Sequence, residues 1–429
     1  MPNAVRYPFK VRAVSTSDLD GGAARAAFRL QKGLLAAGVD SEFWVQRRTT
    51  LSPCVHSSKL IFARQIGRLY TYLDALPKMF YHRRQRGAWS TGFLPNPLLP
   101  LQALRSADLV HFHGVTEGFV PLASVSSIGR PIVWTLHDMA ALTGGCHYAG
   151  ECLGFTKRCG GCPQLGSSRE KDLTRLSIWL KERYWAKADI DLVCPSHWLA
   201  ERARLSPLFY DSTISVIPNG LDLATYKPME RNLARSLLRL PQEPFFLMTA
   251  AMNVTRDRRK GFQHLERALS EIGERASESP LELLVVGDQK IDVGRIGEIP
   301  IRYLGRIDDE ESMAQVYSAA DLFIAPSEQD NLPNTVMEAM ACGTPCIAFD
   351  IGGMSDLIDD QQNGRLIKPF STVELANSIN ELCADRERVL ILGDAAVEKV
   401  HKYFDVNLVA EKYAHLFEDV LERFRKIGE

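Results

Sequence analysis

Short hydrophobic runs alternate with longer segments of helical periodicity along the whole chain. The runs have the length of strands and are continuously apolar, which is typical of strands covered on both faces. Strands are predicted at residues 11–17, 41–46, 108–114, 131–138, 191–196, 245–251, 281–287, 301–307, 321–327, 345–350 and 364–369. Helical patterns fill most of the intervals, the first of them at 22–38. This alternation predicts an α/β protein with parallel sheets and helices on both sheet faces.

The strands are too many for one compact sheet and predict two doubly wound, Rossmann-like domains. The boundary is expected just before a segment of turn residues that includes Pro218 and Gly220. The N-terminal domain then comprises residues 1–213 and the C-terminal domain residues 214–405. The remaining residues, 406–429, predict a long amphipathic helix that packs either on the second domain or back on the first.

Composition narrows the class of protein further. The 429 residues contain 51 Lys and Arg against 52 Asp and Glu, so the basic excess of a nucleic-acid-binding protein is absent. There is no apolar run long enough for a membrane-spanning helix, and the first residues are too charged for a signal peptide. Nine cysteines, an odd number, indicate a reducing compartment, and a cytoplasmic location is expected.

The first predicted strand is followed by a glycine pair, Gly21-Gly22, that precedes the first helix. Two glycines at such a turn let the backbone approach a ligand closely, and the helix N-terminus behind them favours an anion. The GxGxxG and Walker A patterns are absent, which argues against nicotinamide dinucleotides and P-loop phosphoryl transfer. The alternative for the glycine pair is an ordinary tight turn.

A cluster of cations follows the first strand of the second domain, at Arg256, Arg258, Arg259 and Lys260. Arginine can hold a diphosphate through two parallel hydrogen bonds, and lysine can hold it as a point charge. The cluster therefore predicts a diphosphate clamp, with a solvated surface charge run as the alternative.

The segment 325–345 carries the most chemical information. A strand is followed by a polar loop and a short helix. Asp330 is expected in the loop and Glu338 on the helix, near its start. Backbone amides around Asn334 and Thr335 would face an anion placed over the helix N-terminus. One element could thus supply two carboxylates for sugar and ribose hydroxyls, and donors for a phosphate.

Three stretches together carry a resemblance to a known family: Gly21-Gly22, IPNGLD at 217–222 and DNLPNTVMEAMACGTPCIAF at 330–349. The chain resembles the retaining GT-B glycosyltransferases of glycosyltransferase family 4, of the bacterial surface-polysaccharide type. The resemblance implies a nucleotide-sugar donor, with UDP or GDP, in the C-terminal domain and an acceptor in the N-terminal domain. It also implies transfer with retained configuration and without a catalytic metal.

The same resemblance implies roles for single residues. Glu338 corresponds to the acid that binds the ribose hydroxyls, and Lys260 to the lysine that binds the diphosphate. Asp330 takes the first acid position, which contacts the sugar and usually holds Glu. The family's upstream arginine is not at its usual place, and Arg256 and Arg259 are the candidates to replace it.

Two histidines follow predicted strands of the first domain. His137, in WTLHD, matches a family histidine near the sugar and the acceptor, and His113, in HFHG, is a second candidate. A neutral imidazole can donate or accept a proton at the reacting centre. For each, the alternative is a hydrogen-bonded structural histidine. Because no residue stands out as a nucleophile, front-face substitution assisted by the leaving phosphate is the expected mechanism.

A cysteine-rich insertion is expected at 144–165 in the first domain. Its four cysteines are Cys146, Cys152, Cys159 and Cys162. Four thiolates suit tetrahedral zinc, and the last two form a CxxC pair, although the first two are widely spaced for a zinc ribbon. A structural zinc is the expectation, with His147 as a substitute ligand for one thiolate. Free thiols or a disulfide pair are the alternatives.

Residues 59–86 combine aromatic and aliphatic side chains with several Lys and Arg and a single acid, Asp74. A basic, aromatic helix of this kind can lie on an anionic membrane, here the inner face of the plasma membrane, beside a lipid-linked acceptor. The alternative is a helix that covers the core with a solvated basic face.

The leading hypothesis is a hexosyltransferase that moves a sugar from a nucleotide sugar to a glycan or polyprenyl-linked acceptor in exopolysaccharide, capsule or O-antigen synthesis. A second hypothesis is a sugar-nucleotide epimerase or hydrolase on the same fold, which would turn over a donor without an acceptor. A third is a sugar-nucleotide-binding scaffold without catalysis. The fold alone fixes neither the sugar nor the acceptor.

Overall fold

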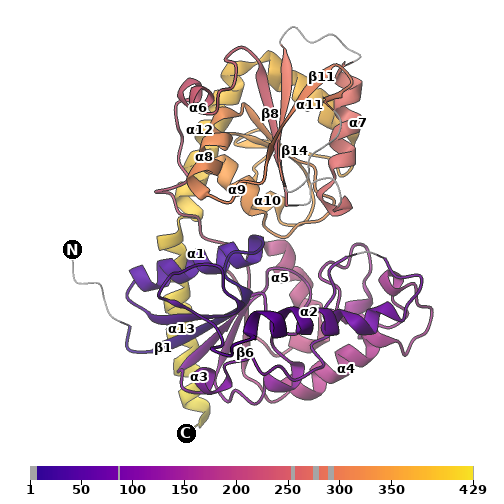
Figure 1. Ribbon diagram of the computed structural model, residues 1–429, viewed down its shortest axis with the longest axis vertical. Coiled ribbons are helices and arrows are strands. Elements are labelled where there is room, and N and C mark those ends of the chain that lie inside the picture. Colours follow the sequence, from indigo (N-terminus) through magenta and orange to yellow (C-terminus); the bar gives the residue numbers. More distant parts are fainter. Residues whose placement is uncertain (1–6, 86, 253–256, 274–279, 288–293, 429) are drawn as a thin grey trace. The chain divides into compact units, whose positions relative to one another are not determined.

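The computed structural model describes residues 7–85, 87–252, 257–273, 280–287 and 294–428. The chain forms two compact units, which are Met1–Gly220 with Asn407–Glu429, and Leu221–Val406 (Figure 1). The described residues of each unit build one seven-stranded sheet between two layers of helices. The predicted fold class, two doubly wound Rossmann-like domains, is confirmed.

The first sheet has the strand order β3-β2-β1-β4-β5-β6-β7, and all neighbouring strands are parallel. The strands are β1 (Lys10–Ser17), β2 (Asp40–Arg47), β3 (Val55–His56), β4 (Leu109–Phe112), β5 (Ile132–Thr135), β6 (Ile190–Cys194) and β7 (Ile214–Val216). The order reverses between β1 and β4. Ligands of doubly wound sheets bind at the carboxyl ends of the strands at such a reversal.

The predicted boundary after residue 213 lies too early in the chain. Strand β7 continues the first sheet, with Leu192 aligned to Ile214, and the first unit extends to Gly220. The hydrophobic pattern missed this strand because three residues are too few to form a recognisable run, and the turn residues beside it dominate the segment.

The second sheet has the order β10-β11-β9-β8-β12-β13-β14, parallel except for the β10–β11 pair. The strands are β8 (Phe245–Ala250), β9 (Leu281–Val286), β10 (Arg295–Ile296), β11 (Ile299–Gly305), β12 (Leu322–Ala325), β13 (Cys346–Phe349) and β14 (Gly364–Ile367). Here the order reverses between β8 and β12, in the same way as in the first sheet.

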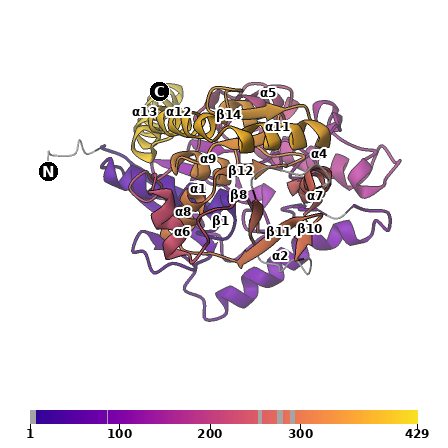
Figure 2. The ribbon, with the colours of Figure 1, turned by 90° about the horizontal axis from the view of Figure 1, so that it is seen from above.

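Helices cover both faces of each sheet because strand side chains alternate between two cores. In β8, Phe246 and Met248 enter one core and Phe245 and Leu247 the other. The first-unit helices are α1 (Gly22–Ala36), α2 (Ala63–Met79), α3 (Leu101–Arg105), α4 (Leu173–Trp185), α5 (His197–Arg204) and α13 (Val406–Gly428). The second-unit helices are α6 (Arg231–Leu237), α7 (Phe262–Gly273), α8 (Glu310–Ala319), α9 (Asn334–Ala341), α10 (Met354–Leu357), α11 (Thr372–Ala384) and α12 (Arg386–Tyr403). Among them, α6 and α8 lie side by side (Figures 1 and 2).

The C-terminal helix, α13, packs on the first unit. Val409, Tyr413 and Phe417 are buried in one cluster with strand residues such as Val133. The Tyr413 hydroxyl also lies 2.9 Å from Oγ1 of Thr135. The sequence left this placement open, because an amphipathic pattern shows that one helix face is buried but does not identify what buries it.

Candidate functional site

A cavity lies in the second unit, where its strand order reverses. In doubly wound sheets this edge is where ligands bind. The cavity contains two of the predicted donor-site residues, Lys260 and Thr335. The other lining residues end β8 and β12 or precede α9, and are Thr249, Ala250, Ala251, Phe323, Ile324, Ala325, Pro326, Ser327 and Pro333.

A tight turn positions Lys260 at this cavity. The 3-10 helix Arg258–Lys260 ends at Gly261, which has a φ of 69°. A Cβ atom at this position would lie 1.7 Å from the carbonyl oxygen of Pro326, so only glycine fits. The close approach of these two backbone segments brings Lys260 next to the loop that follows β12.

Lys260 and Asp330 form an ion pair, with Nζ 2.6 Å from Oδ2. The other carboxylate oxygen of Asp330 accepts a hydrogen bond from the amide of Asn331. Burial alone would raise the pKa of Asp330, but attraction to Lys260 and Arg259 outweighs burial and lowers it. Asp330 is therefore an ionised carboxylate that holds the ammonium group at the cavity.

Arg259 and Arg256 are the two candidates for the arginine that binds the diphosphate, and the structure describes only Arg259. The guanidinium of Arg259 lies 2.9 Å from a carboxylate oxygen of Asp257 and 3.3 Å from the carbonyl oxygen of Gln329. These contacts hold it beside the loop that carries Asp330. Arg256 lies outside the described residues.

Glu338 is buried in α9, and its Oε2 lies 3.0 Å from the Tyr317 hydroxyl on α8. Burial, together with this carboxylate, raises the pKa of Tyr317 far above its ordinary value, so the phenol stays protonated and donates the bond. Glu338 is the fifth residue of α9, not near its start, and is not a cavity-lining residue. Sequence reasoning missed Tyr317 because its partner lies on a different helix.

Asn334 and Thr335 occupy the first two positions of α9, as predicted, and both are half-buried. The first-turn amides of a helix point away from its body and favour an anion. The helix starts at this point because Pro333 precedes it in an extended conformation, with φ -69° and ψ 119°. The start of α9 thus faces the same edge of the sheet as Lys260.

In the first unit, the glycine pair shapes the loop between β1 and α1. Gly21 has a φ of 95°, and a Cβ built on it would meet no atom within 4 Å. Asp18, which is fully buried, anchors the loop by accepting hydrogen bonds from the amides of Thr49 and Thr50. The backbone at Gly21 is therefore open to close approach by a ligand.

His113 and His137 follow the adjacent strands β4 and β5, and their rings meet. Nδ1 of His113 lies 3.1 Å from Nε2 of His137. Burial lowers the pKa of His137 to about 4 and takes that of His113 well below its ordinary value. Both rings are neutral near neutral pH, so one donates the hydrogen bond and the other accepts it. His113 is only 4% exposed, whereas His137 is half-buried.

A third histidine connects this pair to the C-terminal helix. The ring centroid of His111 lies 4.1 Å from that of His113, and its Nε2 lies 2.8 Å from Oγ1 of Thr135. Thr135 in turn contacts Tyr413 of α13. Neither His111 nor Tyr413 was singled out from the sequence, because their relation depends on strand order and on where α13 packs.

The residue after His137 forms a second polar pair. Oδ2 of Asp138 lies 2.8 Å from Nδ1 of His147, whose Nε2 lies 3.3 Å from Oγ of Ser90. Burial opposes the charge on His147, but Asp138 outweighs burial and raises its pKa. Both ring nitrogens of His147 are used in these contacts. His147 is not among the residues that line the cysteine cavity, and its part as a substitute zinc ligand stays a prediction.

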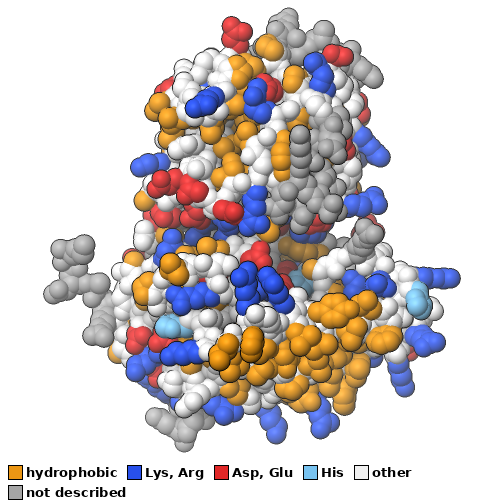
Figure 3. Space-filling view, in the orientation of Figure 1, with side chains coloured by type: hydrophobic (Ala, Val, Ile, Leu, Met, Phe, Trp, Pro, Cys, Tyr) orange, Lys and Arg blue, Asp and Glu red, His pale blue; other side chains and the backbone are white. Residues whose placement is uncertain are grey.

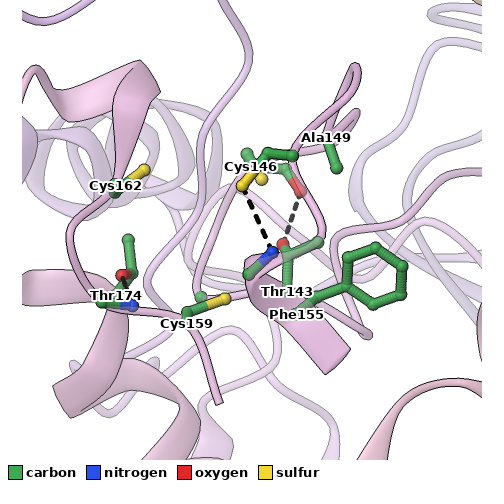
Figure 4. Close-up of a pocket in the computed structure, with 11 residues that line it drawn as sticks. Thr143, Cys146, Ala149, Phe155, Cys159, Cys162 and Thr174 are labelled. Atoms are coloured by element: carbon green, nitrogen blue, oxygen red, sulfur yellow. Dashed lines mark hydrogen bonds between the residues drawn. The ribbon is translucent and has the colours of Figure 1, made fainter. Parts of the chain in front are cut away.

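The four cysteines of the insertion line one cavity (Figure 4). Burial raises the pKa of Cys146 to about 12 and that of Cys159 to about 11, so these thiols are neutral. As the described side chains are placed, no three cysteines, histidines or carboxylates are grouped closely enough to hold a metal ion. The cysteines share a cavity, but their sulfurs are not arranged as a coordination shell, and the predicted zinc stays a prediction.

Comparisons with known proteins follow the same division of the chain. The model of "Glycosyltransferase Family 4" matches residues 20–225, and that of "Glycosyl transferases group 1" matches residues 243–385. D-inositol 3-phosphate glycosyltransferase from Nocardia farcinica is 28% identical over 74% of this chain and 66% of its own length. Alpha-maltose-1-phosphate synthase from Mycolicibacterium smegmatis is 24% identical over 75% of this chain and 80% of its own.

Among solved structures, HepE from Anabaena in complex with UDP and glucose aligns with a TM-score of 0.65. The alignment covers 96% of this chain and 100% of HepE, at 18% identity, and shows a shared fold. Two Rossmann-like units, each matched by a glycosyltransferase model, define the GT-B class. The chain belongs to glycosyltransferase family 4, as the sequence resemblance implied.

Proposed function

We propose that the protein is a retaining glycosyltransferase whose second unit holds a nucleoside diphosphate sugar. The observation that carries the proposal is the cavity at the β8–β12 reversal, where Lys260 and the start of α9 supply positive charge. A diphosphate over the start of α9 would meet the first-turn amides and the Lys260 ammonium. HepE, which shares the fold, was solved with UDP and glucose, and this supports a nucleotide-sugar donor.

The other candidate site residues of the second unit also bind the donor. Glu338 accepts hydrogen bonds from the ribose hydroxyls, with its carboxylate oriented by Tyr317. Asp330 orients Lys260 and accepts from hydroxyls of the sugar. Arg259 adds charge beside Asp330 and replaces the family's upstream arginine at the diphosphate.

The transfer step follows from this arrangement. The bond between the anomeric carbon and the phosphate oxygen breaks, and its electron pair leaves with the nucleoside diphosphate. The acceptor oxygen bonds to the same face of the anomeric carbon, and its proton passes to a phosphate oxygen of the leaving group. Lys260 and the α9 amides stabilise the charge that develops on the diphosphate. Because these groups supply positive charge, we expect no requirement for a catalytic metal.

The first unit supplies the groups for the acceptor side. His137 is the more exposed ring of the histidine pair, and we assign it the contact with the acceptor hydroxyl or the transferred sugar. His113 is a positioning residue, because its hydrogen bond fixes the ring orientation of His137. Gly21 leaves room for a ligand to approach the backbone closely, and the next residue, Gly22, is exposed.

A metal-independent front-face mechanism predicts that turnover needs no added Mg2+ or Mn2+, which an activity assay without added divalent cations checks. It also predicts that the intact protein mass stays unchanged during turnover, since no enzyme side chain becomes glycosylated. Mass spectrometry of the protein, quenched while it consumes donor and acceptor, checks this second point. A covalent glycosyl adduct, or activity that appears only when Mg2+ or Mn2+ is added, would contradict the mechanism.

The donor assignment predicts that one of UDP, GDP and ADP, or its sugar conjugate, raises the melting temperature. A ligand at a hundred times its Kd stabilises by about 2.7 kcal/mol. For domains of this size, roughly 2–4 °C is expected per kcal/mol. Lys260→Met and Glu338→Ala should lose most of this ligand-induced shift. Glu311→Ala, an exposed acid on α8, is the matched control and should keep it.

The donor site is wrongly placed if no nucleotide raises the melting temperature of the wild type. It is also wrongly placed if a nucleotide raises the melting temperature of both site variants as much as that of the wild type. Binding without turnover would favour a non-catalytic scaffold. Turnover of the donor without an acceptor would favour an epimerase or hydrolase.

We propose that the acceptor is a glycan or a polyprenyl-linked sugar in exopolysaccharide, capsule or O-antigen synthesis, reached at the membrane surface. The outward side of α2 and its flanks supports this proposal, because Asp74 turns inward to accept a hydrogen bond from the amide of Thr91. Hydrophobic side chains gather over this part of the first unit (Figure 3). The large exposed ones are Leu60, Ile61, Phe62, Leu69, Tyr72, Leu76, Met79 and Phe80.

The basic side chains beside this apolar surface indicate what it binds. Arg64, Arg68, Arg83 and Arg84 are exposed in the same segment, a combination that fits an anionic lipid surface. Among the described helices, none has the length and apolar character to cross a bilayer. The names of the two relatives favour a different acceptor, a small molecule such as an inositol phosphate. Activity assays with small and with lipid-linked acceptors distinguish the two hypotheses.

The membrane assignment predicts co-sedimentation with vesicles that contain phosphatidylglycerol, weakened by salt, and none with pure phosphatidylcholine. The double variant Ile61→Asp/Phe80→Asp should bind at least about tenfold more weakly, because it removes two of the largest exposed apolar groups. Leu51→Asp, at a residue that is 93% exposed outside this segment, is the control. Equal binding of the double variant and the control, or no binding by the wild type, would refute the assignment.

A further inference from the structure

The cavity lined by the four cysteines of the insertion has no part in the proposed transfer. Cys146 and Cys152 line it together with Cys159 and Cys162, and Figure 4 shows sulfurs from several turns of the chain around one space. We propose that this cavity is a structural zinc site formed by the four cysteines. The proposal is independent of the donor and acceptor assignments.

Hydrogen-bond donors surround the sulfurs, and they support the thiolate form that zinc requires. The amide of Gly154 lies 3.3 Å from Sγ of Cys152. The amide of Gly144 donates to the sulfur of Cys159. Donors to sulfur stabilise a thiolate more than a thiol, and hydrogen bonds of this kind orient the ligands of structural metal sites.

The sulfur of Cys162 follows the same pattern, with the amides of Gln164 and Leu165 as donors. The Thr143 hydroxyl donates instead to the carbonyl oxygen of Cys146, at 2.6 Å. Backbone amides therefore face the sulfurs of Cys152, Cys159 and Cys162.

The backbone between Cys159 and Cys162 is bent into a conformation that is costly to maintain. Arg158 and Cys159 have φ values of 67° and 54°, and the two glycines that follow them also have positive φ. Non-glycine residues in this region cost of order 1–3 kcal/mol each and persist where the surroundings impose them. A metal bound by both ends of the CxxC turn is a constraint of this kind.

A buried cation compensates part of the charge that the site would carry. Lys181 is fully enclosed, and its Nζ lies 2.6 Å from the carbonyl oxygen of Ala140 and 2.7 Å from that of Thr143. Burial lowers the pKa of Lys181 to about 8, and negative charge at Cys159 and Cys146 would oppose this lowering. Four thiolates around a divalent ion leave two negative charges, so a lysine at this position is electrostatically matched to the site.

The sulfurs as placed do not yet form a coordination shell, so zinc binding requires them to converge. Each sulfur must come to about 2.3 Å from a common point. The four side chains that would have to converge already line one cavity.

The site would act on the transfer machinery through the loop after β5. Met139 donates a hydrogen bond from its amide to the carbonyl oxygen of His147, and His147 pairs with Asp138. Oγ1 of Thr143 donates to the carbonyl oxygen of Cys146 at 2.6 Å. Zinc would thus fix the segment that begins directly after His137.

Metal analysis of the full chain, purified without chelator in a reducing buffer, tests the proposal. We expect close to one zinc per chain in the wild type and in Cys54→Ser, which changes a cysteine outside the cavity. Cys159→Ser and Cys162→Ser should lose the zinc. Removing zinc from the wild type with a chelator should lower its melting temperature, and added Zn2+ should restore it.

Thiol counting under denaturing conditions separates the other outcomes and does not depend on whether the variants fold. Nine reactive thiols after zinc removal are expected, because the chain has nine cysteines. Nine thiols without zinc would show free cysteines, and fewer thiols without zinc would show a disulfide. Either result would overturn the proposal, as would zinc retained by both cavity variants.

Discussion

The reversal of strand order in each sheet is the constraint on which the rest of the structure depends. Because β1 and β4 neighbour each other, as do β8 and β12, the segments after these strands meet at one edge of each sheet. In the second unit this brings Lys260, from after β8, against Asp330, from after β12. In the first unit, β5 lies next to β4 on one side of the reversal, and the ends of these two strands bring His113 to the ring of His137.

Residues packed behind these sheet edges hold the side chains of the candidate site in position. Gly261 permits the close backbone approach that places Lys260, and Tyr317 on α8 orients Glu338 on α9. In the first unit, α13 joins the polar chain behind the histidines through Tyr413. The last helix of the chain therefore contributes to the environment of residues that lie far from it in sequence.

Much of this organisation was predictable from the sequence, and the failures have physical reasons. The longer strands were found because continuous apolar runs mark strands buried on both faces, whereas β3, β7 and β10 are too short to leave a pattern. Lys260 and Asp330 were each identified by residue type and resemblance. Their ion pair was not, because it joins residues 70 positions apart through the order of the strands.

The central claim is that the diphosphate of the donor lies over the start of α9, beside Lys260. A crystal structure of the protein with the nucleoside diphosphate that stabilises it most is the direct test. The account predicts phosphate oxygens within hydrogen-bonding distance of Nζ of Lys260 and of the first amides of α9, with the ribose at Glu338. A nucleotide bound instead at Gly21 and Gly22, with the second-unit cavity occupied only by water, would contradict it.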